Sequence, residues 1–215
     1  VRGDSAFGTV FPLVTTAAGS KFGKTEAGAV WLDPVWTSPF RFYQFWVNTA
    51  DDDASRYLRF FTFLDRETIE GLEARAAAEP HRRHAQRALA EDVTRRVHGE
   101  TGLTRALRAT EALFGGSLEG LGAEEISDIF ADVPSSEVSG ASLEGEGLGL
   151  LELLAETGLA SSRGDARRSL EGGGIYLNGD RPEDSQARVR REDAVEGRFL
   201  VLRKGKKSYH LVKVV

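Results

Sequence analysis

A stretch that is poor in large apolar side chains divides the chain and limits what it can fold into. Residues 133–147, VPSSEVSGASLEGEG, combine Pro with repeated Ser and Gly, which is the composition of a mobile linker. The charge balance changes sign at the same place, because residues 1–147 carry 15 Lys and Arg against 23 Asp and Glu, whereas residues 148–215 carry 13 against 10. We therefore expect an acidic body and a small basic module, a pattern typical of proteins that bind a polyanion.

Residues 38–132 predict a helical module. Ser38-Pro39 is a helix start, with Ser as the N-cap and Pro in the first turn. Further starts are expected at the Asp cap of the DDDASRYLRFFTFL segment, after Asp65 and at Pro80. An aromatic stripe at helical spacing follows the first start, and we interpret it as core packing and not as a base-stacking platform. It consists of Phe40, Tyr43, Trp46 and Val47.

Five arginines gather on the helix that is expected after Pro80. They could follow a nucleic-acid backbone, or they could form an ordinary solvated surface, which is the interpretation we favour. They are Arg82, Arg83, Arg87, Arg95 and Arg96.

Residues 1–37 predict extended chain around a glycine loop. FGTVFPLVTT (7–16) and AVWLD (29–33) are rich in strand-forming types, and GSKFGKTEAG (19–28) lies between them. This loop is not a P-loop, because five positions before Gly23 stands Ala18 and no helix follows. Lys21 and Lys24 could still close over a polyphosphate, or the segment could be an ordinary flexible loop.

The basic module predicts two helices and a β-hairpin. A short helix, GLLELLAETG, precedes a second that is capped by Ser161 or Ser162 and stopped by glycines 172–174. Asn178-Gly179 predicts a tight turn, and residues 198–214 predict two strands around Gly205. Two basic clusters on these elements favour a curved phosphate-binding face over chance clustering. They are Arg163, Arg167 and Arg168 on the helix, and Arg203, Lys204, Lys206 and Lys207 at the hairpin tip.

Composition excludes several classes of site. The chain has no Cys, so it has neither disulfides nor thiolate metal ligands. Its four His lack zinc-site spacing. There is no apolar run of about 18 residues and no signal-peptide pattern, so neither a membrane partner nor export is indicated, and a reducing cytoplasm fits.

Three segments carry a family resemblance. FPLVTTAAGSKFGKTEAGAVWLD resembles the signature loop of bacterial tyrosyl-tRNA synthetases, the KFGKS variant of the class I KMSKS motif. TSPFRFYQFWVNTADDDASRYLRFFTFL is similar to the start of that family's helical anticodon-binding domain, and SSRGDARRSLEGGGIYLNG resembles an S4 RNA-binding module. The three occur in the family's order over nearly the whole chain.

The resemblance implies an α+β fold with four parts. Residues 1–37 would end a Rossmann-type catalytic domain, 38–132 would form the helical anticodon-binding domain, 133–147 a linker and 148–215 an S4-like domain. It implies a ligase that activates tyrosine with ATP and Mg²⁺ and transfers it to tRNA(Tyr), in the cytoplasm, as a homodimer and without a protein-bound metal.

Matching positions give the implied site residues. Lys21 and Lys24 become the signature catalytic lysines, and Gly23 and Thr25 join them as ATP-binding members of the loop, Thr25 keeping the hydroxyl of the final Ser. The two basic clusters named above become candidate contacts to the anticodon stem and the long variable arm of tRNA.

No His-x-Gly-His occurs in the chain. The resemblance therefore implies that the chain is the C-terminal half of such an enzyme and is inactive alone. It also implies that this half can be a monomer, since the family's dimer contacts lie in the other half. The alternative is a free-standing S4-type RNA-binding protein without catalytic activity, in which the KFGKT loop is incidental.

Overall fold

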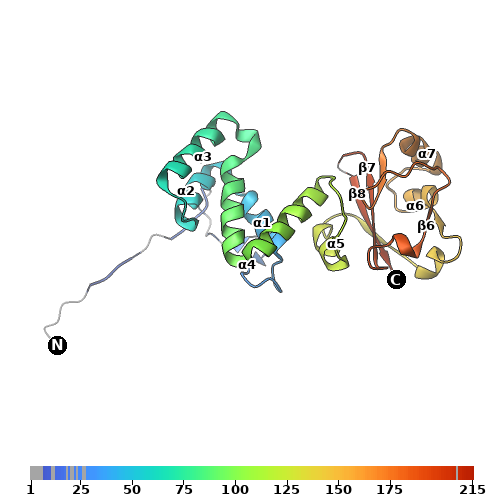
Figure 1. Ribbon diagram of the computed structural model, residues 1–215, viewed down its shortest axis with the longest axis horizontal. Coiled ribbons are helices and arrows are strands. Elements are labelled where there is room, and N and C mark those ends of the chain that lie inside the picture. Colours follow the sequence, from blue (N-terminus) through green and yellow to red (C-terminus); the bar gives the residue numbers. More distant parts are fainter. Residues whose placement is uncertain are drawn as a thin grey trace. The chain divides into compact units, whose positions relative to one another are not determined.

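The computed structural model describes residues 7–10, 13–17, 19, 22, 24–25, 28–206 and 208–215, with the backbone alone for Lys24, Thr25 and Gly28. Two compact units make up the chain, residues 1–100 and residues 101–215 (Figure 1). Helices and a small mixed sheet confirm the expected α+β class. Within the described part of the chain, no helix is long and apolar enough to cross a membrane.

The first unit is helical from residue 39 onwards. A two-residue antiparallel ladder, β1 with β2, precedes the helices, and a short 3₁₀ turn separates α3 from α4. The bounds are β1 Lys24–Thr25, β2 Gly28–Ala29, α1 Pro39–Val47, α2 Asp51–Phe61, α3 Arg66–Ala78, the 3₁₀ turn Pro80–Arg82 and α4 His84–Leu113.

Helix starts follow the predicted caps with two exceptions, the Asp cap before α2 and the start at Pro80, where a 3₁₀ turn forms and α4 begins only at His84. The Ser38 side chain accepts a hydrogen bond from the backbone N–H of Arg41 at 3.2 Å, and Asp65 accepts one from that of Thr68 at 2.7 Å, which confirms both caps. The cap expected from Asp before α2 is wrong, because Ala50 is the N-cap residue and the three aspartates lie in the first helical turn. There their charges favour the positive end of the helix dipole.

The aromatic stripe of α1 packs into the first unit. Tyr43 and Trp46 are buried together with Phe42, and Phe40 and Val47 are half-buried. Burial raises the pKa of Tyr43, with the nearby Glu91 as a further cause. The core-packing interpretation is therefore confirmed.

The extended segments predicted near the N-terminus differ from the structure. Among the described residues of 7–16, only Thr15 forms a β-bridge, and Phe7 and Val10 are almost fully exposed. Of the predicted 29–33 segment, only Ala29 lies in a strand. A strand forms only where a neighbouring backbone accepts its hydrogen bonds, and strand-forming residue types do not supply that neighbour.

Four of the five arginines predicted on the helix after Pro80 interact with the protein itself. Arg83 donates to the Thr49 carbonyl at 2.9 Å, and Arg96 donates to the Phe61 carbonyl at 3.0 Å and pairs with Asp92. Arg82 and Arg95 form ion pairs with Glu79 and Glu100. These contacts support the interpretation of a structural and solvated surface. Gly99, with φ of +72°, interrupts the α4 helix.

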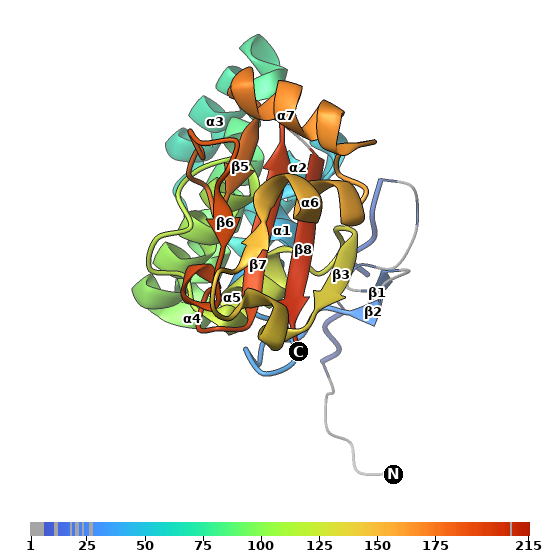
Figure 2. The same ribbon diagram turned by 90° about the vertical axis from the view of Figure 1, so that its right-hand side faces the viewer.

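The second unit is a four-stranded sheet with helices on both faces. The strand order is β3-β8-β7-β5, with β3 parallel to β8 and the other pairs antiparallel. Figures 1 and 2 show α6 and α7 on one face and α5 on the other. The bounds are α5 Ala123–Ile129, β3 Ser135–Val138, β4 Leu148–Gly149, α6 Leu150–Glu156, α7 Arg163–Glu171, β5 Ile175–Leu177, β6 Arg188–Val189, β7 Phe199–Lys204 and β8 Ser208–Val214, with 3₁₀ turns at Gly140–Leu143 and Arg191–Asp193.

The predicted linker is the main difference from the sequence-based organisation. Residues 135–138 form β3, the edge strand that pairs with β8 from Ser135↔Leu211 to Val138↔Val214, and a 3₁₀ turn at 140–143 buries Leu143. The Ser and Gly content of residues 133–147 indicates mobility, but an edge strand needs only main-chain groups and half-exposed side chains. The boundary between the compact units falls after residue 100 instead.

The two helices, the tight turn and the hairpin predicted for residues 148–215 are confirmed. The Ser162 side chain caps α7, Asn178 and Gly179 adopt φ of +50° and +93° in the tight turn, and Gly205 has φ of +66° between β7 and β8. The central strand β7 is buried along almost its whole length, because both faces of the sheet are covered. Leu200 and Leu202 pack with Leu153 and Leu154 of α6 in the core.

Candidate functional site

The signature loop is described in part. Lys21 and Gly23 lie outside the described residues. The backbone of Lys24 and Thr25 forms β1, paired with β2 as Lys24↔Ala29 and Thr25↔Gly28. A P-loop is followed directly by a helix, whereas here a strand follows the glycine. This agrees with the exclusion of a P-loop from the spacing of the motif.

A hydrogen-bonded corner joins the start of α7 to the end of β7. Asp165 accepts hydrogen bonds from the Ser161 backbone N–H at 3.0 Å and from the Lys204 Nζ at 2.8 Å. The Lys204 hydrogen bond is the largest cause that lowers the pKa of Asp165 to about 2, and the Ser161 amide comes next. Lys204 is therefore held against the helix as part of the fold.

The helical basic cluster splits by its contacts. Arg163, Arg167 and Arg168 are all exposed on α7. Arg163 forms an ion pair with Glu152 of α6. Within the part of the chain that the structure describes, the side chains of Arg167 and Arg168 make no hydrogen bond or ion pair. These two guanidinium groups are available to an anion.

The hairpin basic cluster is divided between the two faces of the sheet. Arg203 is only 9% exposed, and its guanidinium carbon lies 3.5 Å from the centroid of the Tyr176 ring and 5.9 Å from that of Tyr209. Lys204, the next residue, points to the opposite face, toward α7. Lys206 is exposed at the turn, and Lys207 lies outside the described residues. Of the predicted tip, Lys206 alone is both described and exposed to a ligand.

The sequence analysis did not predict that Arg203 packs between two tyrosine rings. Tyr176 and Tyr209 flank it in register on β5 and β8, and Arg181 donates to the Tyr176 hydroxyl at 2.8 and 3.0 Å. The hydrogen bond from Arg181 is the first cause that lowers the pKa of Tyr176. The alternation of the 199–204 strand was the available signal, since it places Arg203 and Lys204 on opposite faces.

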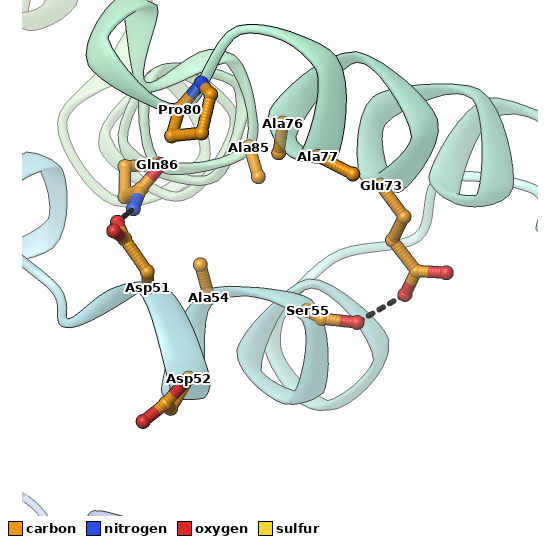
Figure 3. Close-up of a pocket in the computed structure, with 10 residues that line it drawn as sticks. All are labelled: Asp51, Asp52, Ala54, Ser55, Glu73, Ala76, Ala77, Pro80, Ala85 and Gln86. Carbon is orange, nitrogen blue, oxygen red and sulfur yellow. Dashed lines mark hydrogen bonds between the residues drawn. The ribbon is translucent and has the colours of Figure 1, made fainter.

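A cavity of about 350 Å³ lies between α2, α3 and the start of α4 (Figure 3). Asp51 accepts a hydrogen bond from Gln86, and Ser55 donates one to Glu73 across the opposite end. Asp52 also contributes to its lining. Because carboxylates repel phosphate, this cavity does not suit a phosphate group.

The corner of Asp165 and Lys204 predicts a pH dependence. Because the folded-state pKa of Asp165 is depressed, its stabilising contribution is present above about pH 4 and is lost as the pH falls toward about 2. We expect the Lys204→Gln chain to lose less stability than the wild-type chain over that window, in urea denaturation at a series of pH values. Lys206→Gln, on the same turn, is the matched control. Parallel pH profiles for all three chains would contradict the assignment.

Two family models match the chain, one after the other. The model of class I tRNA synthetases (W and Y) matches residues 2–115, more than half of the chain. The chain belongs to this class I tRNA synthetase family. Residues 125–212 of this family member match the tyrosine–tRNA ligase SYY-like C-terminal domain. The resemblance found in the KFGKT loop and the S4-like segment is thereby confirmed.

Curated relatives match almost the whole of this class I synthetase chain. A tyrosine–tRNA ligase of Roseiflexus castenholzii is 53% identical over 213 residues, which are 99% of this chain and 50% of the relative. One from Bacillus caldotenax is 50% identical over 208 residues, 97% of this chain and 48% of the relative. The chain thus spans about half the length of the curated relatives it matches. A solution structure of a tyrosyl-tRNA synthetase C-terminal domain is 41% identical, covering 48% of this chain and 99% of that one, with a TM-score of 0.38.

Proposed function

We propose that this chain is the part of a tyrosine–tRNA ligase that supplies the signature lysine loop and binds tRNA(Tyr). The observation that carries the proposal is the identity of 53% and 50%, over 99% and 97% of the chain, to two relatives that bear that name. In the proposed reaction, the tyrosine carboxylate attacks ATP, taken as its Mg²⁺ complex. Tyrosyl-adenylate forms and pyrophosphate leaves; the tyrosyl group is then transferred to a hydroxyl of tRNA, and AMP leaves.

In this proposal the signature loop serves the activation step. Lys21 and Lys24, with Gly23 and Thr25, contact the phosphates of ATP. Negative charge moves onto the departing pyrophosphate in the transition state, so a lysine ammonium placed there stabilises the transition state more than the bound substrates. The adenosine and tyrosine pockets belong to the nucleotide-binding half of the enzyme.

The second unit serves tRNA binding in this proposal. Arg167 and Arg168 on α7 and Lys206 in the hairpin turn are exposed, and their side chains make no hydrogen bond or ion pair among the described residues. Phosphate contacts of such cations supply most non-specific affinity. Arg163 and Lys207 complete the candidate face, whereas Lys204 is paired with Asp165. We propose that the enzyme acts in the cytoplasm as a homodimer, whose subunit contacts lie in the nucleotide-binding half, while this chain alone is monomeric.

A hybrid enzyme tests the proposed activity. Residues 1–215 replace the matching half of the Roseiflexus castenholzii relative, to which they are 53% identical. We expect tyrosine-dependent exchange of pyrophosphate into ATP and tyrosylation of tRNA(Tyr). An inactive hybrid, alongside a chain that still binds RNA, would contradict the ligase proposal and favour a free-standing RNA-binding protein.

The RNA-binding part predicts a salt dependence. With about five phosphate contacts, the logarithm of the affinity of the chain for tRNA should fall with log[salt] at a slope of roughly −4. Replacing Arg167, Arg168 and Lys206 by Ala removes three contacts, so we expect a slope of about −1.5 in fluorescence anisotropy titrations.

The matched control is a triple variant in the same unit. It replaces three arginines that are already paired with carboxylates. Arg188, Arg190 and Arg198 form ion pairs with Glu146, Glu192 and Glu124. Their replacement by Ala should change the slope less. Equal slopes for the two triple variants would contradict the proposed contact set.

A further inference from the structure

Helix α2 contacts the chain on the N-terminal side of the signature lysines. The carboxylate of Asp53, of which 5% is exposed, accepts a hydrogen bond from the backbone N–H of Ala17 at 3.1 Å. Arg56 forms an ion pair with Asp53 at 2.7 Å and also donates to the backbone carbonyl of Thr15. A buried carboxylate is stable only when it is paired and hydrogen-bonded, so Asp53, Arg56 and the 15–17 segment depend on one another.

Tyr57 adds a second hydrogen bond to the same carbonyl. Its hydroxyl donates to the Thr15 oxygen at 3.2 Å. Burial is the main cause that raises the pKa of Tyr57, and Asp53 adds to it, so the hydroxyl keeps its proton and acts as the donor. Thr15 and Ala17 are therefore attached to one face of α2 by three side chains within one helical turn and a half.

The Phe of the KFGKT motif is held by the same two helices. The centroid of the Phe22 ring lies 5.7 and 5.5 Å from those of Phe45 and Trp46 on α1, and 5.0 and 4.9 Å from those of Tyr57 and Phe61 on α2. These are the distances of favourable edge and stacked ring pairs. The backbone N–H of Phe22 also donates to the Val14 carbonyl at 3.1 Å, which ties the two attachment points together.

We propose that Phe22, Asp53, Arg56 and Tyr57 are positioning residues for Lys24. Lys24 begins β1, two residues after Phe22. The contacts of the Phe22 ring and of the 15–17 segment therefore determine the position at which this strand begins. The inference rests on the proposed function. It assigns α1 and α2 a role in tyrosine activation that is separate from tRNA binding. Displacement of the Lys24 ammonium group by about 1 Å would be enough to lower the rate of activation substantially.

Hydrogen exchange of residues 1–215 tests the attachment without any activity assay. In Phe22→Ala and Arg56→Ala chains, we expect the Ala17 amide to exchange about 10-fold faster than in the wild-type chain. Arg59→Ala is the matched control, because Arg59 lies on the same helix and pairs with Glu73 at 2.6 Å instead of with the loop. An Ala17 exchange rate that is unchanged in both test variants would overturn the attachment.

The hybrid enzyme tests the positioning role. We expect Phe22→Ala and Arg56→Ala to lower kcat of pyrophosphate exchange about 10-fold with the KM for tyrosine nearly constant, and Arg56→Lys, which retains the charge, to recover part of the loss. Tyr57→Phe keeps the ring and removes only the donor, so it should show a smaller loss in a chain that folds. Faster Ala17 exchange with wild-type kcat would overturn the positioning role. An inactive wild-type hybrid with faster exchange in the variants would contradict the proposed function and support the attachment.

Discussion

Replacing Lys24 with Ala is expected to lower kcat for tyrosine activation in the hybrid enzyme about 100-fold. The KM for tyrosine should change less than about twofold, because the ammonium group contacts phosphate and not the amino acid. Tyrosine-dependent pyrophosphate exchange at saturating ATP measures both quantities. The expected size comes from the loss of one fixed charge at a site where negative charge accumulates in the transition state.

Lys206→Ala in the same hybrid is the control for the Lys24 experiment. Lys206 lies in the second unit, in the turn between β7 and β8, and the activation step does not involve tRNA. We expect its pyrophosphate exchange to match that of the wild-type enzyme, while its tRNA affinity falls. If Lys24→Ala raised the KM for tyrosine as much as it lowered kcat, Lys24 would not act in the transition state.

Replacing Arg203 with Ala is expected to lower the free energy of unfolding by about 2 kcal/mol with little loss of RNA affinity. The side chain is buried, lies over the Tyr176 ring and donates to the Gly205 carbonyl at 3.3 Å. Its guanidinium group is thus occupied within the fold, and its removal leaves a gap between β5 and β8. Urea denaturation and fluorescence anisotropy with tRNA measure the two effects on one preparation.

Arg167→Ala should show the reverse behaviour. The Arg167 side chain is exposed on α7 and makes no hydrogen bond or ion pair within the described residues, so we expect a change in stability below about 0.5 kcal/mol and weaker RNA binding. A loss of RNA affinity in Arg203→Ala as large as that in Arg167→Ala, at unchanged stability, would restore Arg203 to the RNA-binding face.

Local patterns predicted most elements because the chemistry of their ends is local. Ser38, Asp65 and Ser162 cap helices through their own side chains, and Asn178-Gly179 and Gly205 supply the positive φ angles that the turns require. The KFGKT loop and the S4-like segment also sufficed to indicate the family, which the family models confirm. Such signals need no knowledge of the remainder of the chain.

Pairings between distant residues could not be predicted from local patterns. Residues 133–147 have the composition of a linker, yet Ser135–Val138 completes the sheet because the exposed edge of β8 accepts its backbone hydrogen bonds. The 7–16 segment has the composition of a strand, yet its described residues find no such edge beyond the bridge at Thr15. Strand formation depends on the neighbour as much as on the residues themselves.

The sequence alone therefore determined the family, the helix starts at Ser38, Asp65 and Ser162 and the two turns of the second unit, because motif residues, caps and backbone preferences act within a few positions. The tertiary structure decided which cations face a ligand. It turned Arg203 inward between two tyrosines, set Lys204 against Asp165 and left Arg167 and Arg168 exposed. It also brought Asp53 and Arg56 to the 15–17 segment. The physical reason is that charge and ring contacts depend on which surfaces meet in space, and segments about 40 residues apart meet only when the helices and the sheet pack.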